Sequence, residues 1–218
     1  MKLSKQLLYR ILLCAVGMFF YATGVAFTKN CNMGISPIVS VAYILSLILP
    51  ITMGWCTTIA NLGMLLAQKL MLGKNFSVKN AIAQIIMSIL FSIFIDWTAA
   101  IWSFLSPENY ILRLILFVVG CFVLAVGVVL VVMANFVVLP AEATVNAMVE
   151  KYKMAFGNAK ILFDALMVVL TVIIGLIFTR SVQGIREGTI IAVVLVGNFA
   201  KLARPMLNKL APREETGA

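Results

Sequence analysis

The chain has 218 residues, of which 63% are hydrophobic and 11% are charged, whereas a soluble domain carries roughly a quarter of its residues as charges. This composition excludes a water-soluble single domain and indicates that a lipid bilayer is the solvent. Each membrane-spanning helix needs about 20 residues, so no room is left for a catalytic domain outside the membrane. We therefore expect an all-α membrane protein that is not an enzyme.

The net charge of +9 comes from 17 Lys and Arg against 8 Asp and Glu. The basic residues occur in ones, twos and threes between apolar stretches, and no continuous basic face is present for a nucleic acid. Histidine is absent, and the four cysteines form no CxxC pair, so we expect no metal site and no cofactor. Cys31 and Cys56 either pair with each other or pack as apolar side chains.

Six apolar segments are long enough to cross the membrane, at about 7–28, 54–72, 81–102, 111–133, 158–179 and 188–203. Two shorter apolar pieces, about 37–49 and 140–149, suit re-entrant or interfacial helices. Each starts at a proline, Pro37 or Pro140, which is favourable in a first helical turn. The first 20 residues also resemble a signal peptide, but no convincing cleavage site follows, so we assign them to the first span.

The distribution of basic residues predicts the orientation, because Lys and Arg favour the cytoplasmic side. With six spans and both termini inside, the cytoplasmic side receives thirteen of them: Lys2, Lys5, Arg10, Lys69, Lys74, Lys79, Lys151, Lys153, Lys160, Lys201, Arg204, Lys209 and Arg213. The outer side receives only Lys29, Arg113, Arg180 and Arg186. Residues 205–218 are predicted to form a cytoplasmic tail.

An internal repeat relates the two halves, which we place at 1–104 and 105–204 within one membrane domain. A shift of 103 residues aligns Arg10 with Arg113, Gly17 with Gly120, Ala22 with Ala125, Gly24 with Gly127, Asn32 with Asn135, Pro37 with Pro140, Gly54 with Gly157, and Asn61 with Asp164. A two-residue insertion then aligns Ala83 with Gly188 and Ser92 with Gly197. Because each repeat crosses the membrane three times, the copies are expected to be inverted, which is typical of transporters.

The repeated positions divide into packing residues and helix breaks. Gly17 and Gly24, and likewise Gly120 and Gly127, are seven residues apart, and small residues on one helix face let two backbones approach. The other repeated positions are Asn32, Pro37, Asn135 and Pro140, which predict a break followed by a new helix. The unpaired amide groups at such a break are tolerated at membrane depth only beside protein or a water-filled cavity.

Several motifs resemble the YczE/YitT-type bacterial integral membrane proteins. The motifs are Gly34-Ile35-Ser36-Pro37-Ile38, Tyr43-Ile44-Leu45-Ser46, Leu139-Pro140-Ala141-Glu142, the spaced Phe156, Lys160 and Asp164, Gly184-Ile185-Arg186-Glu187-Gly188-Thr189, and Val196-Gly197. One departure is Ala141, where the family pattern has glycine. The resemblance spans nearly the whole chain and implies a multi-pass protein of the bacterial cytoplasmic membrane, but it implies no substrate.

Ionisable and polar residues within apolar segments are the candidate binding residues, because their burial in a membrane is costly. A cytoplasmic group contains Glu142, Lys160 and Asp164, of which the last two are spaced to form an ion pair. An outer group contains Ser36, Ser40, Asn61, Arg186 and Glu187. Each group also has a purely structural interpretation: the ion pair neutralises itself, Glu142 complements its helix dipole, and Arg186 with Glu187 forms an ordinary loop pair.

Two functions remain open. The first is secondary transport of a small molecule, with a coupling ion, by alternating access between two polar vestibules. Helix N-termini would favour an anionic or zwitterionic substrate, and Glu142 with Asp164 a cation or proton. The alternative is a membrane scaffold or accessory subunit without transport. An intramembrane enzyme and an ion channel are disfavoured, since no HExxH, GxSxG, charged ring or filter-like loop is present. Asp96, with Trp97 and Trp102, is interpreted as an outer-interface anchor.

Overall fold

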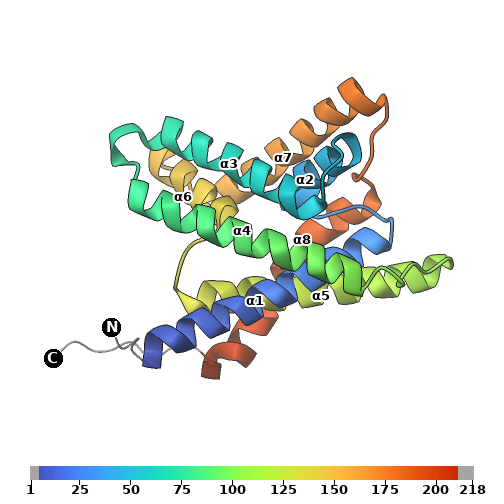
Figure 1. Ribbon diagram of the computed structural model, residues 1–218, viewed down its shortest axis with the longest axis horizontal. Coiled ribbons are helices and arrows are strands. Elements are labelled where there is room, and N and C mark those ends of the chain that lie inside the picture. Colours follow the sequence, from blue (N-terminus) through green and yellow to red (C-terminus); the bar gives the residue numbers. More distant parts are fainter. Residues whose placement is uncertain (1–4, 211–218) are drawn as a thin grey trace.

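The computed structural model describes residues 5–210, and within them it is entirely helical, without a strand. This confirms the all-α class. Eight α-helices follow one another along the chain (Figure 1): α1 Lys5–Asn30, α2 Pro37–Ile48, α3 Met53–Leu72, α4 Val78–Ile101, α5 Tyr110–Ala134, α6 Pro140–Tyr152, α7 Phe156–Thr179 and α8 Glu187–Leu207. Two 3-10 turns, η1 Gly73–Asn75 and η2 Asn208–Leu210, follow α3 and α8.

Five helices are long and apolar enough to cross a membrane, namely α1, α4, α5, α7 and α8 with η2. The chain therefore has the helical composition of a membrane protein. The predicted span at 54–72 corresponds to α3, which is not among the five. The reason is its content of polar side chains, because Thr57, Thr58, Asn61 and Gln68 are all buried on α3. These polar residues lower the mean hydropathy of α3, and the helix turns them toward the protein.

The centre of the fold is the long contact between α1 and α5. Glycines make it close: a Cβ on Gly24 would lie 2.5 Å from the backbone nitrogen of Leu124, and one on Gly127 would lie 2.2 Å from that of Tyr21. Gly17 and Gly120 lie in the same interface. Small residues of this kind allow membrane helices to pack backbone to backbone.

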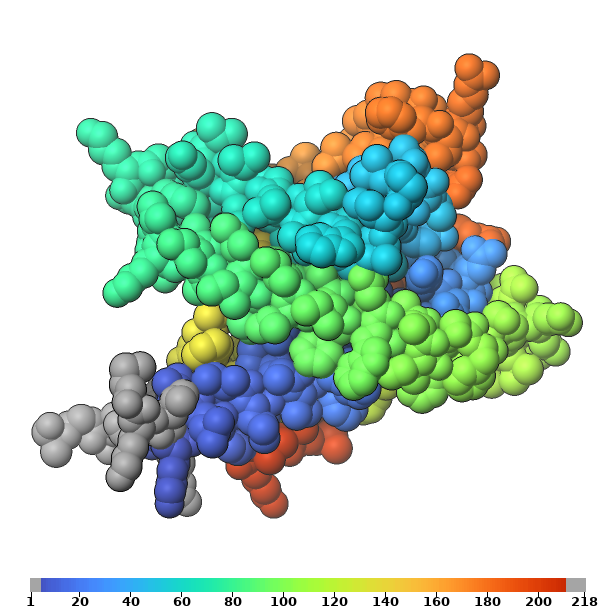
Figure 2. Space-filling model, in the orientation of Figure 1, coloured from blue at the N-terminus to red at the C-terminus, as the bar shows by residue number. Residues whose placement is uncertain are grey.

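The other helix contacts occur in matching pairs. α4 packs on α1 as α8 packs on α5; α2 packs on α3 as α6 packs on α7; and α2 packs on α7 as α3 packs on α6. One contact has no counterpart. α3 packs along α4, but within the described residues α7 is not packed on α8. The end of the α3–α4 hairpin and α7 accordingly project as separate arms (Figures 1 and 2).

Contacts at the start of α3 explain why α3 and α4 pack. The Asp96 carboxylate on α4 accepts hydrogen bonds from the Gly54 amide at 2.8 Å and from the Thr52 hydroxyl at 2.6 Å. It thereby satisfies free N–H groups at the N-terminus of α3. Asp96 thus joins two helices, in addition to lying beside exposed Trp97.

The positions that correspond to this contact in the second half are open. Gly157 and Gly197, the counterparts of Gly54 and Ser92, have no neighbouring atom within 4 Å of a Cβ. The two-residue insertion that aligns the last helix of each half also places Lys201 opposite Asp96. A lysine cannot accept hydrogen bonds from a helix N-terminus and is repelled by its partial positive charge. The sequence therefore lacks the group that would join α7 to α8 at this point.

The C-terminal helix is longer than predicted. The predicted tail starts at 205, but α8 continues through Pro205 to Leu207 and is followed by η2. The Tyr9 hydroxyl donates a hydrogen bond of 2.9 Å to the Leu210 carbonyl, so the start of α1 and the end of η2 lie together. Residues 211–218, and with them Arg213, lie outside the described part of the chain, as does Lys2. All four cysteines are buried and unpaired, so the alternative of a Cys31–Cys56 disulfide was wrong.

Candidate ligand site and linker clamp

The N-terminal ends of the two short helices meet near the middle of the molecule. A small pocket of about 20 Å³ is lined by Ile38 from the start of α2 and by Pro140 and Glu142 from the start of α6. Its other polar lining residues are Tyr21 of α1 and Thr57 and Asn61 of α3. The pocket therefore brings together residues from both halves of the chain.

A larger cavity of about 310 Å³ adjoins this pocket, and Tyr21, Leu139 and Glu142 line both. Its wall is mainly aliphatic, with five valines and Leu139 among the lining residues, together with the aromatic rings of Phe136 and Phe156. The other polar groups on the wall are Asn135 at the end of α5 and Asn146 on α6. The cavity is thus an apolar chamber with a few polar groups, the usual composition of a small-molecule site.

Glu142 is the charged group of this cavity. Its Oε2 atom is buried and has no hydrogen-bond partner. Lys160 on α7 is a positive group that acts on Glu142 electrostatically, but it forms its own ion pair and hydrogen bond with Asp164 one turn away. Because Lys160 is shared with Asp164, the three groups carry an excess of one negative charge when all are ionised.

A second cavity of about 440 Å³ extends the first toward the α3–α4 linker. The two cavities share the lining residues Phe136, Val137, Val138 and Asn146. The far wall is formed by Asn75 and neighbouring residues of the α3–α4 linker and by the first turns of α4. Together the cavities form a route from the α5–α6 linker to Glu142 and Tyr21.

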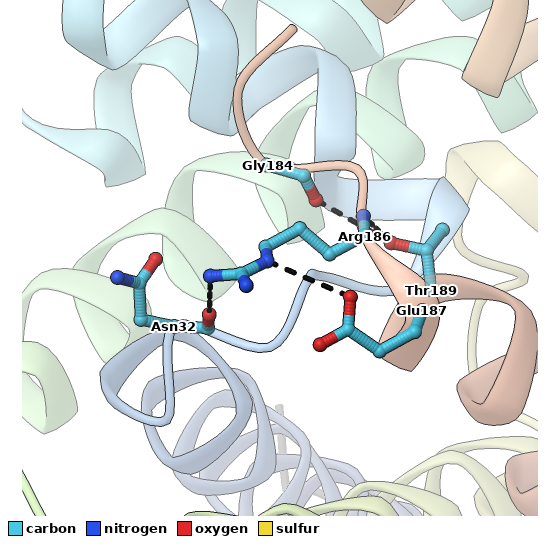
Figure 3. Close-up of polar contacts among 5 residues, drawn as sticks. All are labelled: Asn32, Gly184, Arg186, Glu187 and Thr189. Carbon is cyan, nitrogen blue, oxygen red and sulfur yellow. Dashed lines mark hydrogen bonds and ion pairs between the residues drawn. The ribbon is translucent and has the colours of Figure 1, made fainter. Parts of the chain in front are cut away.

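The corresponding place in the other half is closed by a set of hydrogen bonds that we call the linker clamp. It joins the α1–α2 linker, residues 31–36, to residues 184–189 (Figure 3). The Ile35 amide donates to the Gly184 carbonyl at 3.0 Å, and the Gly188 amide donates to the Met33 carbonyl at 2.9 Å. Two linkers far apart in the sequence are thus held by their backbones.

Side chains reinforce the linker clamp. Arg186 donates a hydrogen bond of 2.8 Å from its Nη1 to the Asn32 carbonyl, and its Nε lies 3.6 Å from the Glu187 carboxylate (Figure 3). Gly34 has φ of +117°, and a Cβ there would lie 2.6 Å from the Thr189 hydroxyl. Only glycine suits this position, because it combines a left-handed backbone with a close approach. Arg186 therefore bridges the two linkers with Glu187 beside it, and neither residue lines the Glu142 cavity.

The remaining predicted binding residues take three different positions. Asn61 lines the small central pocket, and Ser36, buried, directly precedes α2. The Ser40 hydroxyl contacts the Thr171 hydroxyl at 2.8 Å and donates to the Pro37 carbonyl, so it is satisfied within the α2–α7 contact. The predicted outer group is thus dispersed, whereas Glu142, Lys160 and Asp164 lie together.

Two features of the site were not predicted. The first is Tyr21, a buried residue of α1 that lines both the small pocket and the adjoining cavity together with Glu142. An aromatic residue in an apolar helix carries no sequence signal beyond packing. The second is a buried amide pair, Gln68 and Gln84, which exchange hydrogen bonds of 3.1 and 3.2 Å, while Gln68 also reaches Thr144. Two glutamines in apolar segments are a signal that would have identified this pair.

Five apolar helices of membrane-spanning length, two short helices that meet at a pocket, and a buried ionisable cluster define a helical membrane protein with an internal cavity. The chain belongs to a family of unknown function, DUF6198, which it matches over residues 8–205. No curated protein and no solved structure matches it. The finer resemblance to YczE/YitT-type proteins therefore stays a prediction.

Proposed function

We propose that the protein is a secondary transporter of a small molecule that works by alternating access, built as two inverted three-span repeats of the YczE/YitT type with α3 as the sixth span. The matching pairs of helix contacts support the repeat. The orientation follows from the basic residues, which place the α5–α6 linker and both termini on the cytoplasmic side of a bacterial membrane.

The observation that carries this proposal is the difference between two corresponding sites. On the predicted outer side the α1–α2 linker is bound to residues 184–189 by the linker clamp. On the predicted inner side the corresponding α5–α6 linker and the start of α4 are separated by a cavity of about 440 Å³. A transporter with inverted repeats alternates by exchanging the conformations of its two halves. The structure is then the inward-open state.

Accessibility of single cysteines tests the proposal, after the four native cysteines have been replaced. Asn146→Cys, which lines both cavities, should react with an impermeant maleimide from the inner side only. Ser40→Cys, buried beneath the closed side, should react slowly and from the outer side, at a rate set by the population of the outward-open state. A scaffold with one conformation would leave Ser40→Cys unreactive.

A clamp variant sharpens this test. Arg186→Ala removes the hydrogen bond to the Asn32 carbonyl, which is exposed to solvent. The loss of such a bond, about 1–1.4 kcal/mol, raises the outward-open population, and so the labelling rate at Ser40→Cys, about 5- to 10-fold. Arg113→Ala is the matched control, since Arg113 near the start of α5 also donates to a carbonyl, that of Pro107, but this carbonyl lies in the linker directly before the same helix. Equal rates in the two variants, or labelling of both cysteines from one side, would refute alternating access.

A further inference from the structure

The cavity next to Glu142 has the composition expected for one chemical class of ligand, and this inference rests on the proposed transport function. Glu142 has a buried carboxylate oxygen without a hydrogen-bond partner. A buried carboxylate is costly unless it is paired or neutralised. Lys160 does not meet this need fully, because it is already the ion-pair partner of Asp164. The cavity therefore lacks one positive charge.

An anionic ligand does not fit this arrangement. A negative group in the cavity would approach Glu142 directly, with Asp164 close by. The N-terminus of α6 offers little compensation, since Glu142 itself occupies the first turn and offsets the partial positive charge there. Of the two charge preferences that the sequence left open, the structure favours the cation.

The apolar wall narrows the class further. Beyond Glu142, Tyr21 and the two asparagines, the lining consists of valines, Leu139, Phe136 and Phe156. Such a wall cannot replace the water shell of a strongly hydrated metal ion, which needs several oxygen ligands. It does suit a hydrocarbon group, and its aromatic rings can attract a cation through their faces. At about 310 Å³ the cavity is at the small end of ligand sites.

We infer that the cavity binds an organic monocation, an ammonium group with an apolar body, and that Glu142 is its counter-ion. Tyr21 and Asn135 line the same cavity as Glu142, and Asn146 lies where this cavity continues into the second one. The cation enters through the second cavity and neutralises the excess negative charge of the Glu142, Lys160 and Asp164 group.

Binding of three probes that share the phenylpropyl skeleton and differ in their polar group tests the inference. Phenylpropylammonium, phenylpropanol and phenylpropionate are titrated calorimetrically into the purified full chain. We expect the ammonium to bind at least about 30-fold more tightly than the alcohol, because it alone pairs with the buried carboxylate, and the anion not to bind. Equal binding of the ammonium and the alcohol, or tighter binding of the anion, would overturn the inference without any mutation.

A pair of variants locates the binding. Glu142→Gln should weaken binding of the ammonium probe at least about 30-fold. Glu108→Gln is the control, because Glu108 is an exposed acidic residue of the α4–α5 linker that lines neither cavity, and this variant should bind the probe as the wild type does. Glu142→Gln without ligand should also melt at a higher temperature, since it removes a buried charge. An unchanged affinity in Glu142→Gln contradicts the inference.

Two further outcomes are decisive. If sodium chloride alone stabilises the protein through Glu142 and the ammonium probe does not compete with it, an inorganic cation occupies the site and the inference is wrong.

Failure of the cation site is distinguishable from failure of alternating access. If the probe binds but the labelling of Ser40→Cys and Asn146→Cys shows one fixed conformation, the cation site is supported and transport is refuted. If the labelling shows two conformations but the probe does not bind, the protein transports a substrate of another class.

Discussion

The linker clamp and the cavity beside the α5–α6 linker are corresponding places in the two halves, yet one is closed and the other open. Glycines mark the closed side: Gly34, Gly184 and Gly188 allow backbone hydrogen bonds between the linkers. The residues aligned with them by the predicted repeat are Val137, Lys79 and Ala83, each of which carries a side chain where the closed side has a hydrogen atom. In the proposed repeat, a few side chains would thus account for the unequal conformations of the two halves.

The hairpins of the two halves differ in the same way. The α3–α4 hairpin is closed by Asp96 at the start of α3, whereas Lys201 occupies the aligned position on α8, which in the described part of the chain is not packed on α7. In the first half, the hairpin is closed by a carboxylate that accepts a hydrogen bond from a free amide at the start of a helix. In the second half this acceptor is missing, and the two helices stay apart. Substitutions that exchange or remove these groups test whether they cause the inequality between the halves.

The largest effect is expected from Gly34→Ala in the linker clamp. The new Cβ would meet Thr189 at 2.6 Å and would force alanine into φ of +117°, which together cost about 2–4 kcal/mol. We expect a lower midpoint of thermal unfolding in detergent and faster labelling of Ser40→Cys. Gly73→Ala is the control, because Gly73 also has positive φ, +53°, but no neighbour within 4 Å; it should cost about 1 kcal/mol. Similar losses in both variants would show that the clamp contact is not tight.

A smaller effect is expected from Asp96→Ala. The variant leaves the Gly54 amide and the Thr52 hydroxyl without their acceptor, at a cost of about 2 kcal/mol. Denaturation in detergent measures the loss, and Asp96→Asn should recover part of it because an amide oxygen still accepts a hydrogen bond. Glu108→Ala, at an exposed acidic residue near the same end of α4, should change stability by less than about 0.5 kcal/mol. Wild-type stability of Asp96→Ala would remove the explanation for the α3–α4 contact.

Helix positions were predictable to the extent that apolar length and proline determine them. Pro37 and Pro140 stand at the first residues of α2 and α6, where proline is favourable because no backbone donor is lost. Pro205 misled for the opposite reason: it lies within α8 close to its end, where proline usually stops a helix. The polar residues that lower the hydropathy of α3 make sense only in the folded protein, because Thr58 forms a hydrogen bond to α4 and Gln68 forms one to α6.

The candidate site was predictable where it is charged. Glu142, Lys160 and Asp164 stand out because ionisable groups in apolar segments are rare, and the helical spacing of Lys160 and Asp164 gives their ion pair directly. Tyr21 and the valines of the cavity could not be distinguished from ordinary core residues. The separation of α7 from α8 was equally hidden, because apolar helices carry the same pattern whether they face lipid or protein.

The smallest expected effect concerns the hydrogen bond between Thr58 and Ser92, whose hydroxyls lie 2.6 Å apart between α3 and α4. Their counterparts, Ile161 and Gly197, have no polar side chain, so the bond belongs to the closed hairpin alone. Hydrogen bonds between membrane helices contribute about 0.6 kcal/mol on average. A double-mutant cycle with Thr58→Val and Ser92→Ala should give a coupling energy of this size. A coupling energy below about 0.3 kcal/mol would be indistinguishable from additivity, and the close packing at Gly54 would then hold the hairpin together without this pair.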